Sequence, residues 1–91
     1  MERKEVQFLL KEYTKGDSLI QLNDGRILFY YYTGIRDVYV YSDKTFKKLF
    51  EIDSNSFISN YEKDIDKFCY KYNIKLIDND FILIGYSKYL I

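Results

Sequence analysis

The residue types that most often carry out chemistry in proteins are scarce in this chain. Cys69 is the only cysteine, and the sequence contains no histidine. Without an imidazole there is no Ser-His-Asp triad and no Cys-His pair, and the commonest metal ligand is missing. One cysteine also allows neither an internal disulfide nor a Cys/His zinc site within a single chain. We therefore predict a protein that is not an enzyme and that binds no metal or cofactor.

Cys69 could itself act as a nucleophile if the positive charge of Lys67 or Lys71 lowered the pKa of its thiol. Its neighbours along the chain are Phe68 and Tyr70. Free cysteine between apolar residues is among the residue types most often buried. We interpret Cys69 as a residue of the core or of its boundary.

Two groups of carboxylates look like the beginnings of a site. Asp78-Asn79-Asp80 could open a calcium loop, but the glycine and the closing glutamate that such a loop needs are missing. Glu62, Asp64 and Asp66 could do acid-base chemistry only if they converged in a cleft that raised a pKa. We interpret the first group as a turn and the second as a solvated face.

Tyrosine is the most abundant aromatic residue of the chain, with 11 copies in 91 residues. Tyrosines on adjacent antiparallel strands can share one face of a sheet. Such a face can be cross-strand packing, can anchor a protein partner, or can stack on nucleic-acid bases. The candidate interaction face consists of four tyrosines in two stretches of the chain: Tyr30, Tyr32, Tyr39 and Tyr41.

Composition and charge indicate a soluble folded domain. Hydrophobic residues make up 47% of the chain, far above the content of disordered segments. The 14 basic residues are balanced by 14 acidic ones, so we expect no long-range attraction to nucleic acid or to a membrane surface. The N-terminus is too charged for a secretory signal, and no apolar run reaches the roughly 18 residues of a membrane span. We expect a cytoplasmic protein.

Residues 18–52 carry the clearest strand signals, because β-branched and aromatic residues recur there in short runs between turn residues. Asn23-Asp24-Gly25 contains the Asp-Gly dipeptide of a tight hairpin turn. Residues 38–41 alternate valine with tyrosine, which is the period of a strand. We predict an antiparallel four-stranded meander with strands at residues 19–22, 26–32, 38–41 and 46–52.

The remaining segments give weaker signals. Residues 1–17 fit either a helix or a strand. Residues 53–73 are predicted as a linker that could contain a helix, since Ile65, Phe68, Cys69 and Tyr72 recur at helical spacing behind Ser59-Asn60-Tyr61-Glu62, which could be a capping box. For the chain as a whole we expect at most one or two short helices. Residues 74–91 are predicted as a second hairpin, with strands at 74–77 and 81–84. The fold class is therefore mainly β.

A pattern of strand, acidic turn and strand occurs twice, at residues 20–29 and 74–83. Together with residues 38–47, which run from an apolar-Tyr strand through a polar turn to Thr-Phe-Lys, residues 22–28 resemble a WD40-like β-propeller repeat. The resemblance covers about one blade and part of another, and the Gly-His and Trp-Asp dipeptides of that family are missing. It implies a binding scaffold. Because one blade cannot close a ring, it also implies a fragment or an assembly of copies.

We thus predict that residues 1–91 are a single domain or a fragment that works, without catalysis, by contact with an unidentified protein partner or with itself. The contact would use the tyrosine face or an unpaired sheet edge that accepts another strand. One alternative is a small nucleic-acid-binding domain or a carboxylate/tyrosine-based enzyme domain. A further alternative is an incomplete gene product with no function of its own.

Overall fold

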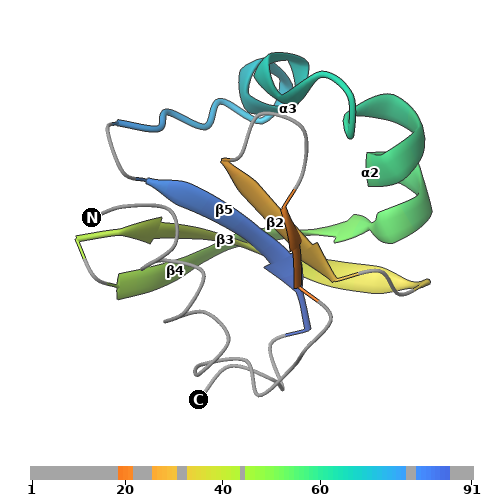
Figure 1. Ribbon diagram of the computed structural model, residues 1–91, viewed down its shortest axis with the longest axis horizontal. Coiled ribbons are helices and arrows are strands. Elements are labelled where there is room, and N and C mark those ends of the chain that lie inside the picture. Colours follow the sequence, from red (N-terminus) through yellow and green to blue (C-terminus); the bar gives the residue numbers. More distant parts are fainter. Residues whose placement is uncertain (1–18, 22–25, 31–32, 44, 78–79, 87–91) are drawn as a thin grey trace.

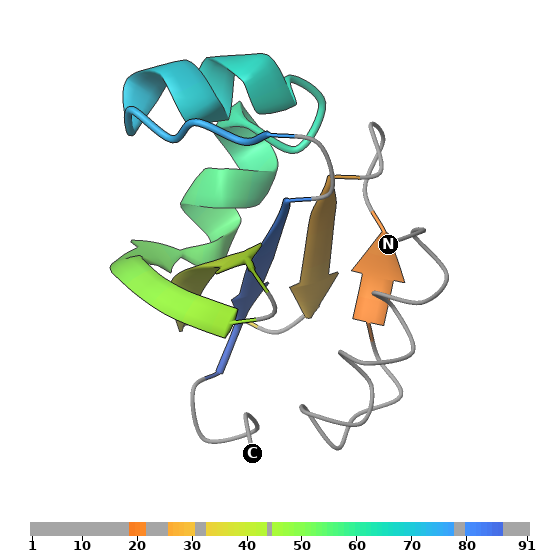
Figure 2. The ribbon, with the colours of Figure 1, turned by 90° about the vertical axis from the view of Figure 1, so that its left-hand side faces the viewer.

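The structure is a computed structural model, and it describes residues 19–21, 26–30, 33–43, 45–77 and 80–86. These residues form one five-stranded sheet with the strand order β1-β2-β5-β3-β4, and two short helices cover one of its faces (Figures 1 and 2). The elements are β1 (Leu19–Gln21), β2 (Ile27–Tyr30), β3 (Ile35–Ser42), β4 (Thr45–Asp53), α2 (Ser54–Asn60), α3 (Ile65–Lys71) and β5 (Phe81–Gly85). The prediction of a mainly β fold with short helices is confirmed.

Two antiparallel hairpins account for four of the strands. β1 pairs with β2, with Leu19 opposite Tyr30, and β3 pairs with β4, with Tyr41 opposite Phe46. The β3–β4 turn is tightened by Asp43, whose φ is +50°, a conformation that aspartate tolerates better than most residues. The strands predicted within residues 18–52 are therefore found close to their expected places.

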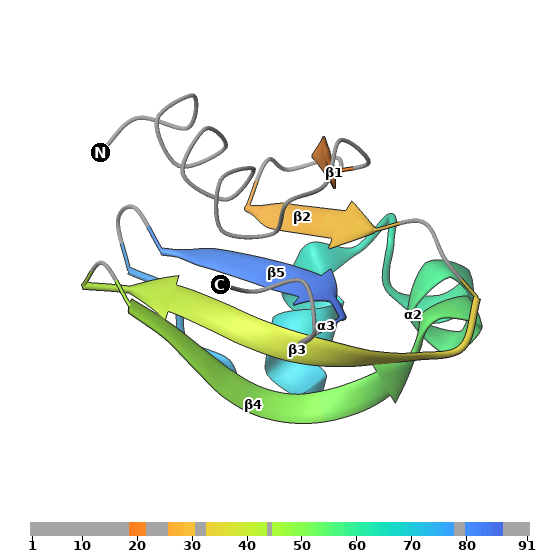
Figure 3. The same cartoon turned by 90° about the horizontal axis from the view of Figure 1, so that it is seen from below.

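The prediction that these four strands form a meander is wrong. β2 and β3 are not neighbours, because β5 lies between them, parallel to β2 and antiparallel to β3 (Figure 3). The physical reason is the composition of β5. Phe-Ile-Leu-Ile-Gly is apolar at every position and all five residues are buried, which suits a central strand covered on both faces.

The predicted second hairpin over residues 74–91 is also not found in the part of that segment that the structure describes. Residues 74–77 form no strand, although Ile74 and Leu76 pack against the core on the helix side of the sheet. The alternating apolar residues of this segment therefore pack against the core, and the segment does not pair with a strand of the sheet. Residues 87–91 lie outside the described residues, as do residues 1–17, for which a helix or a strand was predicted.

Both helices begin at an aspartate that caps them. The carboxylate of Asp53 accepts a hydrogen bond from the Ser56 amide at 3.0 Å, and that of Asp64 accepts one from the Lys67 amide at 3.0 Å. Each bond satisfies a backbone donor that has no partner within the helix. The helix expected within residues 53–73 corresponds to α3, which is capped by Asp64 and not by Ser59, and α2 is a second helix in the same range.

The sheet is covered by apolar side chains on both faces, because alternate residues of a strand point in opposite directions. The helix-side cluster contains residues from β2, β3, β4, β5 and both helices: Ile27, Phe29, Val38, Ile52, Phe57, Ile65, Phe68, Ile82 and Ile84. The tyrosine-side cluster contains Leu28, Tyr39, Tyr41, Phe81 and Leu83, with Phe46 packed against it. No helix among the described residues is long and apolar enough to cross a membrane.

Candidate interaction surfaces

The structure places two of the four predicted interface tyrosines inside the protein. Tyr39 and Tyr41 are each 6% exposed, and the Tyr41 ring packs against Phe46 with the ring centres 4.9 Å apart. For Tyr30 the backbone of β2 is described but the side chain is not, and Tyr32 lies outside the described residues. Tyr39 and Tyr41 therefore share a face as predicted, and that face is packed. Their role in binding stays a prediction.

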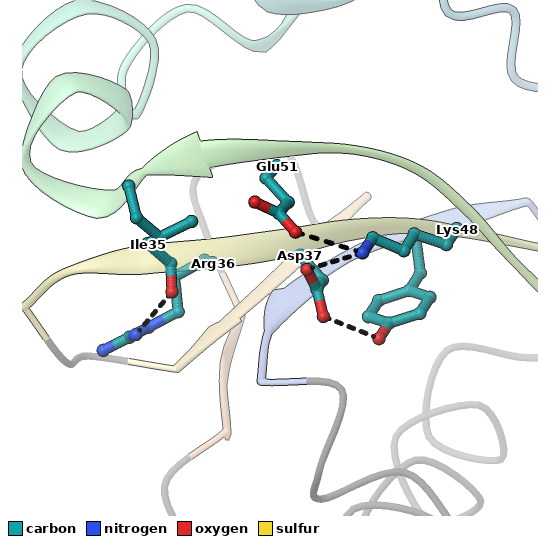
Figure 4. Close-up of polar contacts among 6 residues, drawn as sticks. Ile35, Arg36, Asp37, Lys48 and Glu51 are labelled. Carbon is teal, nitrogen blue, oxygen red and sulfur yellow. Dashed lines mark hydrogen bonds and ion pairs between the residues drawn. The ribbon is translucent and has the colours of Figure 1, made fainter.

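A polar network joins β3 to β4 at the margin of the tyrosine-side cluster. The carboxylate of Asp37 accepts a hydrogen bond from the Tyr39 hydroxyl at 3.1 Å and pairs with the Lys48 ammonium at 3.1 Å (Figure 4). Lys48 also pairs with Glu51 at 3.2 Å. Hydrogen bonds to Asp37 and then to Glu51 raise the pKa of Lys48 above its ordinary value of 10.5. The network holds the outer strand to its neighbour.

The carboxylates predicted as a solvated face have structural partners. Asp64 caps α3, and Asp66 forms an exposed ion pair with Arg26 at 2.7 Å. Asp80 accepts a hydrogen bond from the Ile77 amide at 3.1 Å, which is a turn contact, while Asp78 and Asn79 lie outside the described residues. Within the described ranges, no three potential metal ligands come together.

Cys69 is half-buried and packs against the helix-side cluster, as predicted for a residue at the boundary of the core. Nearby, Tyr72 has its phenol pKa raised, first by desolvation and then by its interaction with Tyr61. This pair and Phe68 belong to a group of aromatic rings whose centres lie 5.1 to 5.9 Å apart. The group is packing between α2, α3 and the segment that follows α3.

Arg36 is a buried charge that sequence reasoning missed. It is 0% exposed, and its guanidinium donates hydrogen bonds to the carbonyls of Thr33 at 2.7 Å and Ile35 at 2.9 Å. It also lies 3.7 Å from the centre of the Tyr86 ring, a cation–π contact. An arginine next to a glycine turn is usually exposed, so the local sequence does not indicate that Arg36 is buried. The structure shows its burial and its hydrogen bonds to the carbonyls of Thr33 and Ile35.

The β4 strand is one end of the sheet, and we call its outer side the β4 edge (Figure 3). It is nine residues long, whereas β1 at the opposite end has three. The pairing with β3 shifts register between Val38 and Tyr39, which makes Leu49 the extra residue of a β-bulge. Leu49 is 37% exposed.

A hollow of about 320 Å³ lies beside the β4 edge on the helix side of the sheet. Its floor is aromatic, because Phe50 stacks on Tyr72 with the ring centres 4.4 Å apart. Leu49 is also part of the lining, and Lys75 adds a positive charge to it. The residues lining the hollow come from β3, β4 and the segment after α3: Val40, Leu49, Phe50, Tyr72, Asn73, Ile74 and Lys75.

The charges of β4 are divided between its two halves. Lys47 and Lys48 precede Leu49, and Glu51 and Asp53 follow it. Leu49 is the central residue of Thr45–Asp53, so the strand has a basic first half and an acidic second half around an apolar centre. Sequence reasoning predicted an unpaired edge without naming the strand, because strand order decides which strand is outermost.

Comparisons of the chain with models of protein families, with curated proteins and with solved structures find no match. The resemblance to WD40-like repeats therefore stays a prediction.

Proposed function

We propose that this protein is a non-enzymatic interaction module that binds an extended segment of a protein chain along the β4 edge. The observation that carries the proposal is a nine-residue strand at the end of the sheet beside a hollow that is lined in part by aliphatic and aromatic side chains. The outer backbone N–H and C=O groups of an end strand can pair with a further strand, which gives affinity. A side-chain pocket next to that strand gives specificity.

The hollow suits one apolar side chain of the bound segment. Its 320 Å³ is at the small end of the range of roughly 300 to 1,000 Å³ for ligand sites. The stacked rings of Phe50 and Tyr72 provide a rigid apolar surface, and exposed Leu49 extends it to the strand edge. We infer that the bound segment carries a leucine, isoleucine or aromatic residue opposite Leu49.

We place the contact at the β4 edge rather than on the tyrosine face because Tyr39 and Tyr41 are buried, whereas Leu49 is 37% exposed. Both surfaces belong to the same proposed mode of action, and a WD40-like scaffold would also act by contact with proteins. We keep the cytoplasm as the proposed location, since a chain with one cysteine suits a reducing compartment.

A displayed library of random peptides of about nine residues, the length of β4, tests the proposal. The wild-type protein should select peptides rich in β-branched and aromatic residues. Leu49→Lys should abolish their binding, because it places a charge at the apolar centre of the edge. Ile77→Lys is the matched control: Ile77 is 68% exposed and lies outside the sheet, so this variant should keep binding. Selection of peptides that bind both variants equally would refute the edge as the site.

A further inference from the structure

We propose that the segment bound at the β4 edge is acidic beside its apolar residue, so that carboxylates of the segment pair with Lys47 and Lys75 while the apolar side chain occupies the hollow. This inference rests on the proposed function and names the chemistry of its partner. The partner is an extended peptide in which aspartate or glutamate flanks a leucine, isoleucine or aromatic residue. Backbone pairing, apolar contact and charge complementarity would then act together at one sheet edge.

The bulge of β4 turns two successive side chains towards the hollow. Successive residues of a regular strand point to opposite faces of the sheet. Leu49 and Phe50 are successive, yet both line the hollow. Phe50 lies opposite Val38 in the β3–β4 ladder, and Leu49 has no residue opposite it. The extra residue therefore adds apolar surface on the outermost strand, where an added segment would lie (Figure 3).

Two lysines lie on the same side of the sheet as the hollow. Lys47 is opposite Val40 in the β3–β4 ladder, and residues directly opposite each other share one face of a sheet. Val40 lines the hollow, so Lys47 is on the hollow side of the edge strand. Lys75, in the segment after α3, is itself one of the lining residues. Both lysines are exposed, which leaves their charges accessible to a bound segment.

These two charges are not compensated by the part of the chain that the structure describes. Neither Lys47 nor Lys75 forms an ion pair with a described residue, and no carboxylate is among the residues lining the hollow. Lys48, on the other face of the sheet, is the opposite case, because it pairs with Asp37 and Glu51 (Figure 4). The hollow side of the edge is thus basic, and an acidic segment is complementary to it.

The same lysines would decide which segments are rejected. Lysine on a sheet edge is a common protection against indiscriminate strand pairing. A basic segment would be repelled by Lys47 and Lys75, and a neutral one would gain nothing from them. A segment with carboxylates beside its apolar residue would compensate both charges. The edge would therefore select its partner by attraction and by repulsion together.

Three labelled peptides of nine residues, the length of β4, test the inference. Each is rich in threonine and valine and has leucine at its centre. They differ only in the residues two positions to either side of that leucine, which are glutamate, glutamine or lysine. In fluorescence anisotropy at low salt, the wild-type protein should bind the glutamate peptide about three- to tenfold more tightly than the glutamine peptide, and the lysine peptide most weakly. Added salt should reduce these differences, because it screens exposed charges.

Charge reversal on the protein gives the matching test. Lys47→Glu and Lys75→Glu should each reduce the preference for the glutamate peptide, and the variant with both changes should prefer the lysine peptide. Lys63→Glu is the matched control, because it makes the same change at an exposed lysine between the two helices. This control should keep the wild-type order of affinities. Far-ultraviolet circular dichroism on every variant separates a change in specificity from loss of the fold.

The inference is overturned if the wild-type protein binds the glutamate and glutamine peptides equally. It is also overturned if the folded double variant still prefers glutamate, or if the random library yields Leu49-dependent peptides without acidic residues beside their apolar residue. In each of these cases binding that is lost in Leu49→Lys leaves the proposed function standing. If none of the three peptides binds and the library yields no Leu49-dependent peptide, the proposed function and the inference are both wrong.

Discussion

The hydroxyl of Tyr39 donates a hydrogen bond of 3.1 Å to the carboxylate of Asp37, two residues earlier on the same face of β3. The same carboxylate pairs with Lys48 on β4 at 3.1 Å (Figure 4). Tyrosine can therefore be buried here with its polar end satisfied, as buried tyrosines usually are. The contact also fixes the carboxylate that holds the outer strand.

Removing the Tyr39 hydroxyl should destabilise the protein. Tyr39→Phe should lower the free energy of unfolding by about 1 kcal/mol, the usual net value of a buried hydrogen bond. Urea denaturation of Tyr39→Phe, Asp37→Ala and the double variant measures the coupling. The two effects should be non-additive by a similar amount. Additive effects would mean that the hydrogen bond contributes nothing to stability.

Stability should depend on the ionisation of Lys48 at high pH. Its pKa is raised in the folded protein, chiefly by hydrogen bonds to Asp37 and Glu51. A raised folded-state pKa gives a contribution that is complete below the unfolded value of 10.5 and is lost as the pH rises through the folded value. The difference in unfolding free energy between wild type and Lys48→Met should therefore shrink above pH 10.5. Urea titrations of both proteins across this pH range measure the difference, and a difference that stays constant through pH 10.5 would contradict the prediction.

The buried phenylalanine of α3, Phe68, should be essential to the stability of the protein. Phe68 is 0% exposed, and its ring meets Phe57 edge-on with the centres 5.0 Å apart. Phe68→Ala should cost about 3 to 5 kcal/mol, the range for a buried phenylalanine. Tyr70, on the same helix, is 91% exposed, so Tyr70→Ala should change stability by less than about 0.5 kcal/mol. If thermal or urea unfolding showed that Phe68→Ala and Tyr70→Ala lose similar amounts of stability, the packing of α3 would be contradicted.

The cap of α3 should contribute a measurable part of the helix stability. Asp64→Ala removes the carboxylate that accepts the Lys67 amide and should cost about 1 kcal/mol. Asp64→Asn keeps a side-chain oxygen for that bond and should cost clearly less. If chemical denaturation finds the two variants equally stable, the hydrogen bond is not what stabilises the start of the helix.

The hairpins and helices could be predicted from the sequence because their signals are local. Asp24-Gly25 between apolar runs predicts the first hairpin, and the valine–tyrosine alternation at residues 38–41 predicts β3. Ile65 and Phe68 recur at helical spacing and are buried on α3. In each case the sequence pattern and the structure that it predicts involve the same few neighbouring residues.

The strand order could not be read in this way, because it depends on pairing between distant segments. β5 pairs with β2 although partners such as Ile27 and Ile82 are 55 positions apart in the sequence, and no hairpin turn connects the two strands. One signal was present: an uninterrupted apolar run such as residues 81–84 suits a strand buried on both faces better than a hairpin at a sheet edge. The identity of β4 as the end strand follows only once β5 is placed in the centre.

The candidate tyrosine face shows the same limit for side chains. Alternation correctly puts Tyr39 and Tyr41 on one face, but it does not say whether that face is covered. A tyrosine side chain has an apolar ring and a polar hydroxyl, so it occurs both buried and exposed in proteins. The residue type alone therefore does not predict whether a given tyrosine is buried. Leu49 is the opposite case: an apolar residue within a strand pattern is expected to be buried, and the bulge leaves it exposed.

The central position of β5 also has a consequence for how the chain reaches its folded state. Translation makes the β1–β2 and β3–β4 hairpins first, and no strand pairing joins them until Phe81–Gly85 has been made and inserted between them. Until then β2 and β3 each have an open side where another strand can bind. Pairings of such high sequence separation slow folding. We therefore expect joining of the hairpins by β5 to limit the folding rate, with the nascent chain most prone to aggregation just before that step.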